Sequence, residues 1–438
     1  MKNSLNIEIN KYLLKYKAPD WFISNPPKEK FSCIIVIPAI CELKNITNLI
    51  ESLNKNNRKY FNDTLIIFVI NNLQSSNEKI KSENYATINY LNKLDKSQNE
   101  QLNIAVIDAS SSGKELPEKD GGVGFARKIG MDISLDYFDF AKQNNLMVCL
   151  DADCLVETNY LETLHNYKNK SVGAGTIPFR HMFSDIEEEK YAIVCYEIFL
   201  SYYVAGLIYA NSPFGFFSIG STMVCNPELY IKIQGMNKRK AAEDFYFMEK
   251  LAKLVKIKIL KGTYVYPQGR TSWRVPFGTG QRITRYLTHE QNEYLLYDPQ
   301  IFNVLKEWNN VFLTNQIQTS NFYLEKANQI NAQLNKFLIN NSFSEAWDKI
   351  LSNNKSADQI NKQKYFWFDS FRTLKLVHYL RDFAFPNKAM FVALEEFFFI
   401  SNISGLFNLP PLMPNISDQL KYLEKLNHFI ENSGHIIN

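Results

Sequence analysis

The sequence predicts an α/β protein with a mainly parallel central sheet, followed by a mostly α-helical C-terminal module. Two observations predict this arrangement. In the first half of the 438-residue chain, short β-branched apolar runs alternate with polar stretches that have helical apolar spacing. From about Tyr286 onward, glycine nearly vanishes and amphipathic helical patterns follow one another. Alternating strands and helices are typical of a parallel sheet that helices cover on both faces.

Four apolar runs have the length and composition of buried strands: Ser32–Pro38, Leu65–Ile70, Leu102–Ile107 and Leu146–Leu150. Helical spacing follows the first run from Glu42 to Leu53 and precedes the fourth from Gly124 to Phe138. The polar stretch from Asn77 to Asn99 does not fit the strand pattern, and we interpret it as an inserted helix and loop. Ligands of such sheets bind beyond the carboxyl ends of the strands.

The chain is longer than one compact domain usually is, and the pattern divides it into three parts. We expect an N-terminal helical extension over residues 1–30, the α/β domain over 31–285 and the helical module over 286–438. Within the module, the apolar spacing predicts helices at Phe322–Leu338, Tyr365–Phe383, Met390–Phe399 and Ile416–Ile430.

The composition excludes several classes of protein. With 45% hydrophobic and 21% charged residues, the chain is globular and not largely disordered. A net charge of +4 is too small for the dense basic surface of a nucleic-acid-binding protein. None of the six cysteines forms a CxxC pair, and most lie in apolar runs, which is typical of buried free thiols in a reducing compartment. The Lys-, Asn- and Ile-rich composition is typical of an AT-rich bacterial genome.

We expect a cytoplasmic protein because the N-terminus has no signal-peptide hydrophobic region. The most apolar long stretch runs from Tyr191 to Phe217. Glu197 interrupts it and Asn211-Ser212-Pro213 breaks it, so the remaining run is shorter than the roughly 20 apolar residues of a membrane-spanning helix. A buried or interfacial helix is the better interpretation, and it leaves peripheral contact with the inner face of a membrane open.

Two carboxylates stand directly after the fourth apolar run. Asp151 and Asp153 follow Leu150, with one residue between them. Buried strands rarely hold acids unless those acids are paired or bind a metal. Carboxylates at i and i+2 beside a strand end can hold Mg²⁺ or Mn²⁺ together with phosphate oxygens of a substrate, which would neutralise a departing diphosphate. The strand placement favours this function over the alternative, an Asx-type turn.

Two helix starts carry weaker signals. Glycines open the segment from Gly121 to Asp132, and Arg127 stands about one turn inside, at an end of the helix that favours anions. Glu243 and Asp244 open an apolar helical pattern, in which Asp244 could act as a general base. The alternatives are an ordinary helix start with a surface arginine and acids that only complement the helix dipole.

The segment from Arg270 to Arg282 is the fourth candidate. Three arginines interleave there with glycines and with Trp273. This composition is typical of a loop that faces phosphates or an acceptor, and a plain surface loop is the alternative.

Taken in order, these segments resemble glycosyltransferase family 2, whose catalytic domain has the GT-A fold. The resemblance covers Phe31 to Gln281. The run that ends in Pro38 and Glu42 is similar to the V-I-P-x-x-N-E signature of the family, with Cys41 in place of asparagine. Asn71-Asn72 stands where Asp-Asp is common, and Lys128 replaces the asparagine after the family's arginine.

The resemblance implies roles for the matched residues. Asp151 and Asp153 match the DxD metal motif, and Glu243-Asp244 match the E-D pair, whose aspartate is the base in inverting members. Donor binding is implied for Pro38, Ala39, Glu42, Asn72, Gly124, Arg127 and Asp151. An acceptor or phosphate role is expected of Gly220, Ser221, Arg270, Trp273 and Arg274.

We therefore expect a metal-dependent, inverting, hexosyltransferase-like glycosyltransferase. Its cofactor would be Mg²⁺ or Mn²⁺, its donor a UDP- or GDP-sugar, and its acceptor a glycan, a lipid or a small molecule. A non-processive enzyme is expected, because Gln281 and Arg285-Tyr286 lack the spacing of the Q-x-x-R-W motif.

Two alternatives remain. A nucleotidyltransferase would need a glycine-rich loop that is missing after Pro38. A non-catalytic sugar- or nucleotide-binding scaffold on the same core would bind without turnover.

Overall fold

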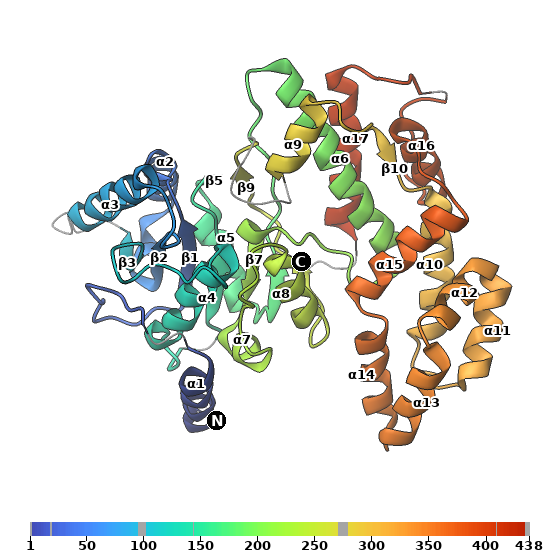
Figure 1. The fold of residues 1–438 in the computed structure, drawn as a ribbon, viewed down its shortest axis with the longest axis horizontal. Coiled ribbons are helices and arrows are strands. Elements are labelled where there is room, and N and C mark those ends of the chain that lie inside the picture. Colours follow the sequence, from blue (N-terminus) through green and yellow to red (C-terminus); the bar gives the residue numbers. More distant parts are fainter. Residues whose placement is uncertain are drawn as a thin grey trace.

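The computed structural model describes residues 2–17, 20–94, 102–142, 144–269, 279–408 and 410–433. Its centre is a seven-stranded sheet of order β3-β2-β1-β4-β7-β6-β8, on the left in Figure 1. The strands are β1 (Cys33–Ala39), β2 (Thr64–Asn71), β3 (Asn103–Ala109), β4 (Leu146–Cys149), β6 (Ala174–Thr176), β7 (Met223–Cys225) and β8 (Lys258–Ile259).

The sheet is mainly parallel, because β1 pairs in parallel with both β2 and β4, and β2 with β3. β7 runs antiparallel to its neighbours β4 and β6, and β8 is parallel to β6. Every residue of β1 and of β2 is buried, as expected for strands with both faces covered. The predicted α/β class with a mainly parallel sheet and a helical C-terminal part is confirmed.

Helices cover both faces of this sheet. Odd-numbered β1 residues such as Ile35 pack with α2, while even-numbered residues such as Val36 pack with α4. This follows from the period of two along a strand. The helices in this part are α1 (Lys2–Tyr16), α2 (Leu43–Asn54), α3 (Glu78–Lys93), α4 (Val123–Ser134), α5 (Tyr160–Asn169), α7 (Pro227–Lys232) and α8 (Glu243–Ala252).

The predicted helix within Asn77–Asn99 is present as α3, but the prediction that this segment is an insertion was wrong. Helix α3 is the regular crossover between β2 and β3, and the Asn77 side chain caps it by accepting a hydrogen bond from the Ile80 nitrogen at 3.0 Å. Only Ile80, Asn84, Thr87 and Leu91 of α3 are buried, so its polar composition hid its role in the sheet.

Helix α6 (Glu187–Tyr209) is longer than the sequence suggested. Glu197 does not interrupt it, because its carboxylate is buried and accepts a hydrogen bond from the His181 main-chain nitrogen at 2.6 Å. The helix does end before the predicted break at Asn211. Within the described residues α6 is the one helix long and apolar enough to cross a membrane, and 72% of its apolar window is buried inside the protein.

The C-terminal helices share one aromatic core. Trp308, Phe312, Tyr323 and Trp347 are fully buried in it. They come from α10 (Pro299–Phe312), α11 (Ser320–Ile330) and α13 (Phe343–Asn353). The remaining elements are α9 (Thr279–Leu287), α12 (Ala332–Asn340), α14 (Ala357–Trp367), α15 (Ser370–Phe383), α16 (Met390–Ile400), α17 (Ile416–Asn432), β10 (Leu295–Leu296) and β11 (Lys388–Ala389).

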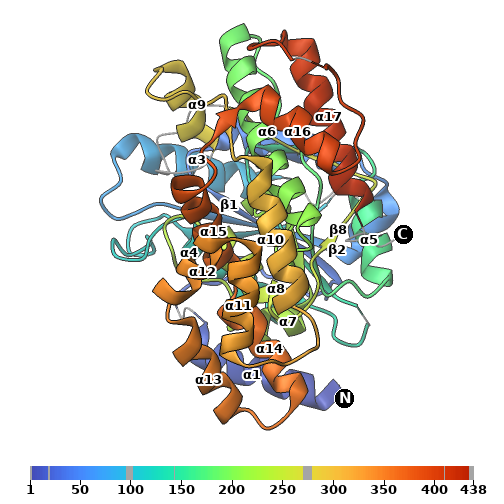
Figure 2. The same ribbon diagram turned by 90° about the vertical axis from the view of Figure 1, so that its right-hand side faces the viewer.

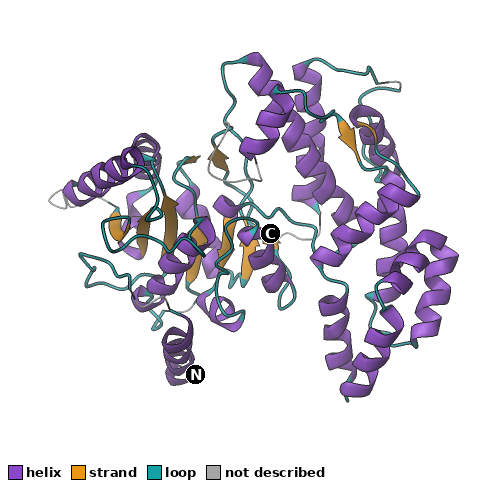
Figure 3. Cartoon of the chain, viewed as in Figure 1, coloured by secondary structure: helices purple, strands orange, loops and turns teal. Residues whose placement is uncertain are grey.

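Helix α6 belongs to that core although it precedes residue 286. It packs along α17 and α9, and Gly206 lets the Phe302 ring lie against its backbone, where a Cβ would be 2.3 Å from the ring. Figures 1 and 2 show α6 beside α10 and α17, and Figure 3 shows the helical part as separate from the main sheet. The predicted division near residue 286 stays a prediction.

Two predicted helices of the module are each two helices. Asn331 separates α11 from α12 and accepts hydrogen bonds from the Gln333 and Leu334 nitrogens. Asp369 separates α14 from α15 and accepts from the Arg372 nitrogen at 2.9 Å. Short polar side chains of this kind start new helices by satisfying unpaired backbone nitrogens, so the apolar period alone did not reveal the breaks.

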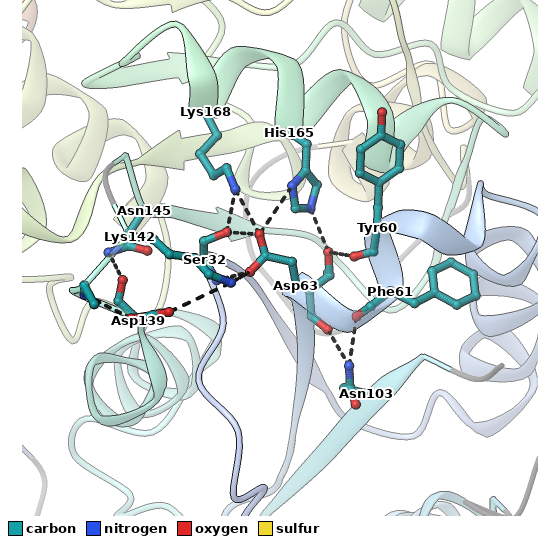
Figure 4. Close-up of polar contacts among 12 residues, drawn as sticks. Ser32, Tyr60, Phe61, Asp63, Asn103, Asp139, Lys142, Asn145, His165 and Lys168 are labelled. Carbon is teal, nitrogen blue, oxygen red and sulfur yellow. Dashed lines mark hydrogen bonds and ion pairs between the residues drawn. The ribbon is translucent and has the colours of Figure 1, made fainter. Parts of the chain in front are cut away.

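A polar cluster ties together the amino-terminal ends of β1, β2 and β4. Asp63, just before β2, accepts hydrogen bonds from Lys142 at 2.8 Å and from Lys168 at 3.0 Å, and it also binds Ser32 (Figure 4). The His165 ring lies 3.8 Å from the same carboxylate. We call these residues the Asp63 cluster. It lies at the edge of the sheet opposite the one where the parallel strands end.

Candidate active site

The two predicted metal ligands lie between β4 and a small second sheet. β4 ends at Cys149, and the Cys154 nitrogen donates to the Asp151 oxygen at 3.2 Å to form a turn. The chain then enters β5 (Cys154–Val156), which pairs antiparallel with β9 (Val265–Pro267). The side chains of Asp151 and Asp153 are both partly exposed at this turn. Both carboxylates are therefore present at the carboxyl end of the central strand.

A buried arginine joins this turn to a second helix. The Arg127 side chain is 3% exposed. One of its terminal nitrogens donates to Asp151 Oδ1 at 2.5 Å and the other donates to Glu243 Oε1. Its Nε has no hydrogen-bond partner among the described residues. Arg127 thus connects the end of β4 with the start of α8, and with them two segments that the sequence predicted separately.

Two glycines make room for this arrangement. A Cβ at Gly220 would lie 2.2 Å from a terminal nitrogen of Arg127. A Cβ at Gly124 would lie 2.4 Å from the main-chain oxygen of Arg239 and 2.9 Å from the Cβ of Glu243. Gly220 begins a short 3-10 turn in which Ser221 is also buried. Side chains at either glycine would displace the arginine or the helix that carries Glu243.

The acids of α8 stand at its first turn. Ala242 before them has a left-handed backbone, with φ of 57°, and caps the helix with no side-chain hydrogen bond. Asp244 Oδ1 accepts from the Phe245 nitrogen at 2.7 Å. Negative charge is favourable at a helix N-terminus, and here the Glu243 carboxylate also binds the guanidinium of Arg127. Glu243 is buried, whereas Asp244 is partly exposed.

The surroundings change the acidity of Asp244. Burial and then the charge of Glu243 raise the pKa of Asp244 to about 7, against the opposing effect of Arg127. Burial alone would lower the pKa of Arg127, but the carboxylates of Asp151 and Glu243 outweigh it and hold the guanidinium protonated. A carboxyl with a pKa near neutrality can take up a proton from a substrate at physiological pH.

One of the predicted donor residues near the end of β1, Glu42, is linked to the same turn by hydrogen bonds. Pro38 and Ala39 are buried at that strand end. Glu42 accepts a hydrogen bond from Asn45, and the Asn45 oxygen accepts from Gln268 at 2.9 Å. The main-chain nitrogen of Gln268 in turn donates to the main-chain oxygen of Asp153 at 3.2 Å. Glu42 is therefore linked to the DxD turn.

The side chain of Asn72 is buried instead, and it makes hydrogen bonds within the fold. It is 1% exposed, its Oδ1 accepts from Asn84 at 2.8 Å and its Nδ2 donates to the Leu73 oxygen at 3.0 Å. The neighbouring Asn71 donates to the Ala39 oxygen at 3.0 Å. The Asn71 amide therefore links the ends of β2 and β1, whereas the Asn72 amide links the end of β2 to α3. A contact of Asn72 with a nucleotide stays a prediction.

The predicted phosphate loop cannot be compared with the structure. Arg270, Trp273 and Arg274 fall outside the described residues, which resume at Thr279, the first residue of α9.

Sequence reasoning missed the Gln268 link and a buried histidine near the site. His181 Nδ1 lies 2.8 Å from Glu197 Oε1, and its Nε2 lies 3.2 Å from the Thr279 hydroxyl. No local motif marks this pair, because its members come from separate segments. For Gln268 a signal was present: residues 264–268 alternate aromatic or polar with apolar side chains, which predicts a half-exposed strand.

The chemistry of the donor set is compatible with a hard cation. No group of three or more His, Cys, Asp and Glu side chains within the described residues is arranged to hold a metal. Asp151 and Asp153 offer two carboxylates at a partly exposed turn. Mg²⁺ typically takes one or two carboxylates and completes its shell with substrate phosphates and water. The two aspartates therefore fit a metal that arrives with a diphosphate, rather than a permanent protein-only site.

Comparisons with known proteins give similarity of fold at low sequence identity. No protein-family model and no curated protein sequence matches this chain. S. aureus TarS 1-349 in complex with UDP-GlcNAc is similar, with a TM-score of 0.39, 11% identity, and coverage of 77% of this chain and 91% of that chain. The mannosyltransferase PcManGT from Pyrobaculum calidifontis in complex with GDP-Man and Mn²⁺ has a TM-score of 0.35, 14% identity, and coverage of 86% and 95%.

Proposed function

We propose that this protein is a glycosyltransferase that moves a sugar from a nucleotide-diphosphate sugar to an acceptor hydroxyl, with inversion and one sugar at a time. One observation carries the proposal. A carboxyl with a pKa raised to about 7, Asp244, lies in the same charged site as Arg127 and the Asp151–Asp153 turn. A base, a cation and a pair of oxygen ligands for a metal are the groups that this transfer needs.

Each residue then has a role. Asp244 accepts the proton of the acceptor hydroxyl as that oxygen attacks the anomeric carbon from the side opposite the leaving diphosphate. Glu243 is a positioning residue, because its carboxylate is 5% exposed and bound to Arg127. Arg127 fixes the Asp151 carboxylate at the end of β4.

Asp151 and Asp153 would hold Mg²⁺ or Mn²⁺ on the donor. That cation would supply charge neutralisation for the leaving nucleoside diphosphate. Gly124 and Gly220 leave the space in which this assembly fits.

Nucleotide binding tests the proposal most directly. UDP, GDP, CMP, dTDP, UDP-GlcNAc and GDP-mannose would each be added with and without Mn²⁺, and the thermal stability of the protein measured. A ligand at about 100 times its dissociation constant adds about 2.7 kcal/mol to the free energy of unfolding, which is a readable shift. We expect a metal-dependent shift with one nucleotide.

Two variants decide whether the shift comes from this site. Asp153→Ala should lose the metal-dependent shift. Asp382→Ala, which removes a half-exposed aspartate near the end of α15, is the matched control and should keep it. Absence of any nucleotide shift in the wild type, or an unchanged shift in Asp153→Ala, would overturn the donor site. If transfer occurs, NMR of the product's anomeric carbon tests inversion.

A further inference from the structure

The small sheet beside the DxD turn has one buried face and one partly exposed face. Cys154, Val156 and Val265 are buried in the core, and Pro267 is also buried. The alternate residues Leu155, Tyr264, Tyr266 and Gln268 are partly exposed, and Leu155 pairs directly with Tyr266. Because side chains alternate along a strand, these partly exposed residues share one face.

That face is continuous with the proposed reaction centre. The main-chain nitrogen of Gln268 donates to the main-chain oxygen of Asp153. Asp153 therefore lies opposite Gln268, in the same register in which Leu155 lies opposite Tyr266. Asp153, Gln268, Tyr266 and Tyr264 therefore follow one another along the sheet. Gln268 and Tyr264 are four residues apart, which is roughly 13 Å along a strand. This is room for a short oligosaccharide rather than for one sugar.

The two tyrosine rings are held in place by acids. The Tyr266 hydroxyl donates to Glu157 Oε1 at 2.9 Å, and the Tyr264 hydroxyl donates to Glu431 Oε1 at 2.8 Å. The Arg180 guanidinium lies 4.4 Å from the centre of the Tyr264 ring. Tyr266 thus offers a fixed aromatic surface, with carboxylates beside it that can accept hydrogen bonds from hydroxyl groups.

Helix α17 forms the far end of this face, because Glu431 belongs to it. Figure 1 shows β9 between the main sheet and helices α6 and α17. The C-terminal helices therefore contribute a side chain to a surface that begins at the DxD turn.

We propose that the exposed face of β5 and β9, from Asp153 through Gln268 and Tyr266 to Tyr264, binds a carbohydrate acceptor. A pyranose ring would stack on Tyr266, and its hydroxyls would donate to Glu157 and Glu431. The ring of Tyr266 with the carboxylates of Glu157 and Glu431 nearby matches a sugar, which offers an apolar face and hydroxyl donors, whereas those two carboxylates disfavour a polyanion. The inference rests on the proposed glycosyltransferase function and names the acceptor class for it.

Saturation-transfer NMR with chitotriose, mannotriose, cellotriose and maltotriose tests this site, with affinities measured by titration. We expect the wild type to bind at least one of them. Tyr266→Ala should weaken that binding by about tenfold, the size of a stacking contact worth about 1.4 kcal/mol. Tyr266→Phe keeps the ring and should restore binding. Tyr85→Ala removes a tyrosine that is 65% exposed on α3, and it should bind like the wild type.

The outcomes separate this inference from the function on which it rests. Wild-type protein that shows the metal-dependent nucleotide shift but binds none of the four oligosaccharides would overturn the acceptor face and leave the donor site standing. Equal binding by wild type and Tyr266→Ala would overturn it as well. Loss of the nucleotide shift in wild type, by contrast, counts against the glycosyltransferase itself.

Discussion

A cluster of charged side chains lies at each of the two edges of the central sheet where the parallel strands begin and end. The two clusters differ in their ratio of cations to carboxylates. At the amino-terminal edge, the single carboxylate of Asp63 receives hydrogen bonds from Lys142, Lys168 and Ser32 (Figure 4). At the carboxyl edge, the single guanidinium of Arg127 faces the carboxylates of Asp151 and Glu243. Within the part of the chain that the structure describes, cations are in excess around the acid at one edge, whereas acids are in excess around the cation at the other.

The acidities follow this balance. Burial would raise the pKa of Asp63, but the hydrogen bonds from Lys142, Ser32 and Lys168 outweigh it and hold that pKa well below its usual range. Burial and the charge of Glu243 raise the pKa of Asp244 instead. In the Asp63 cluster the carboxylate receives hydrogen bonds from two lysines and a serine, and the cluster stabilises the fold. Among the described residues, the other cluster has one guanidinium for the carboxylates of Asp151 and Glu243, and this excess of negative charge is favourable for a metal ion and for a base.

The largest expected effect is on catalysis. Asp244→Asn should lower the transfer rate by about 10²–10⁴-fold, because it removes the proton acceptor. The matched variant is Asp63→Asn, which removes the acid of the opposite edge and should leave the rate within about twofold, well under the 1.4 kcal/mol of a tenfold change. The measurement is release of nucleoside diphosphate with an oligosaccharide acceptor. Comparable losses in both variants would contradict the assignment of Asp244 as the base.

A smaller effect is expected on stability when each edge loses a cation. Arg127→Met leaves the buried Glu243 carboxylate without its partner and should cost about 3–5 kcal/mol of unfolding free energy. Lys168→Met should cost about 1 kcal/mol, because Asp63 keeps Lys142 and Ser32 as hydrogen-bond donors. Urea unfolding measures both values. Equal losses would contradict the distinction between a satisfied and an unsatisfied cluster.

Much of the sheet could be predicted because its strands are runs of β-branched residues. The predicted run Leu65–Ile70 lies inside β2, and Leu146–Leu150 differs from β4 by one residue. The antiparallel β7 was not predicted, since three residues are too short for a periodic signal. Helix breaks at Asn331 and Asp369 were missed because each cap lies inside a continuous apolar period.

In the candidate site, too, some residues could be predicted from the sequence and others could not. Asp151, Asp153 and Asp244 carry local signals, since acids at a strand end or at a helix start stand out in the sequence. The ion pair between Arg127 and Glu243 spans 116 residues and leaves no local pattern. The face formed by Tyr266 and Asp153 depends on the pairing of β5 with β9, which alternation along one strand cannot reveal.

The smallest effect is a difference in pH dependence between the two edges. Asp63 has a lowered pKa, so its contribution to stability is present above the ordinary aspartate pKa near 4 and is lost as the pH falls below it. Asp244 has a pKa raised to about 7, so the folded protein keeps a proton that the unfolded chain has lost. Its cost to stability therefore grows as the pH rises from about 4 to about 7.

Melting temperatures measured from about pH 2 to about pH 8 test these opposite signs. Asp244→Asn should be more stable than wild type at pH 8, by roughly 1–2 kcal/mol, and this gain should vanish near pH 4. Asp63→Asn should be less stable than wild type at pH 8, and its deficit should shrink below pH 4. Asp63 is stabilised by its neighbours as a carboxylate, whereas Asp244 is destabilised as one. The stability difference between each variant and wild type must therefore change with pH in opposite directions. Parallel curves for the two variants would mean that the charge balance at the two edges is the same.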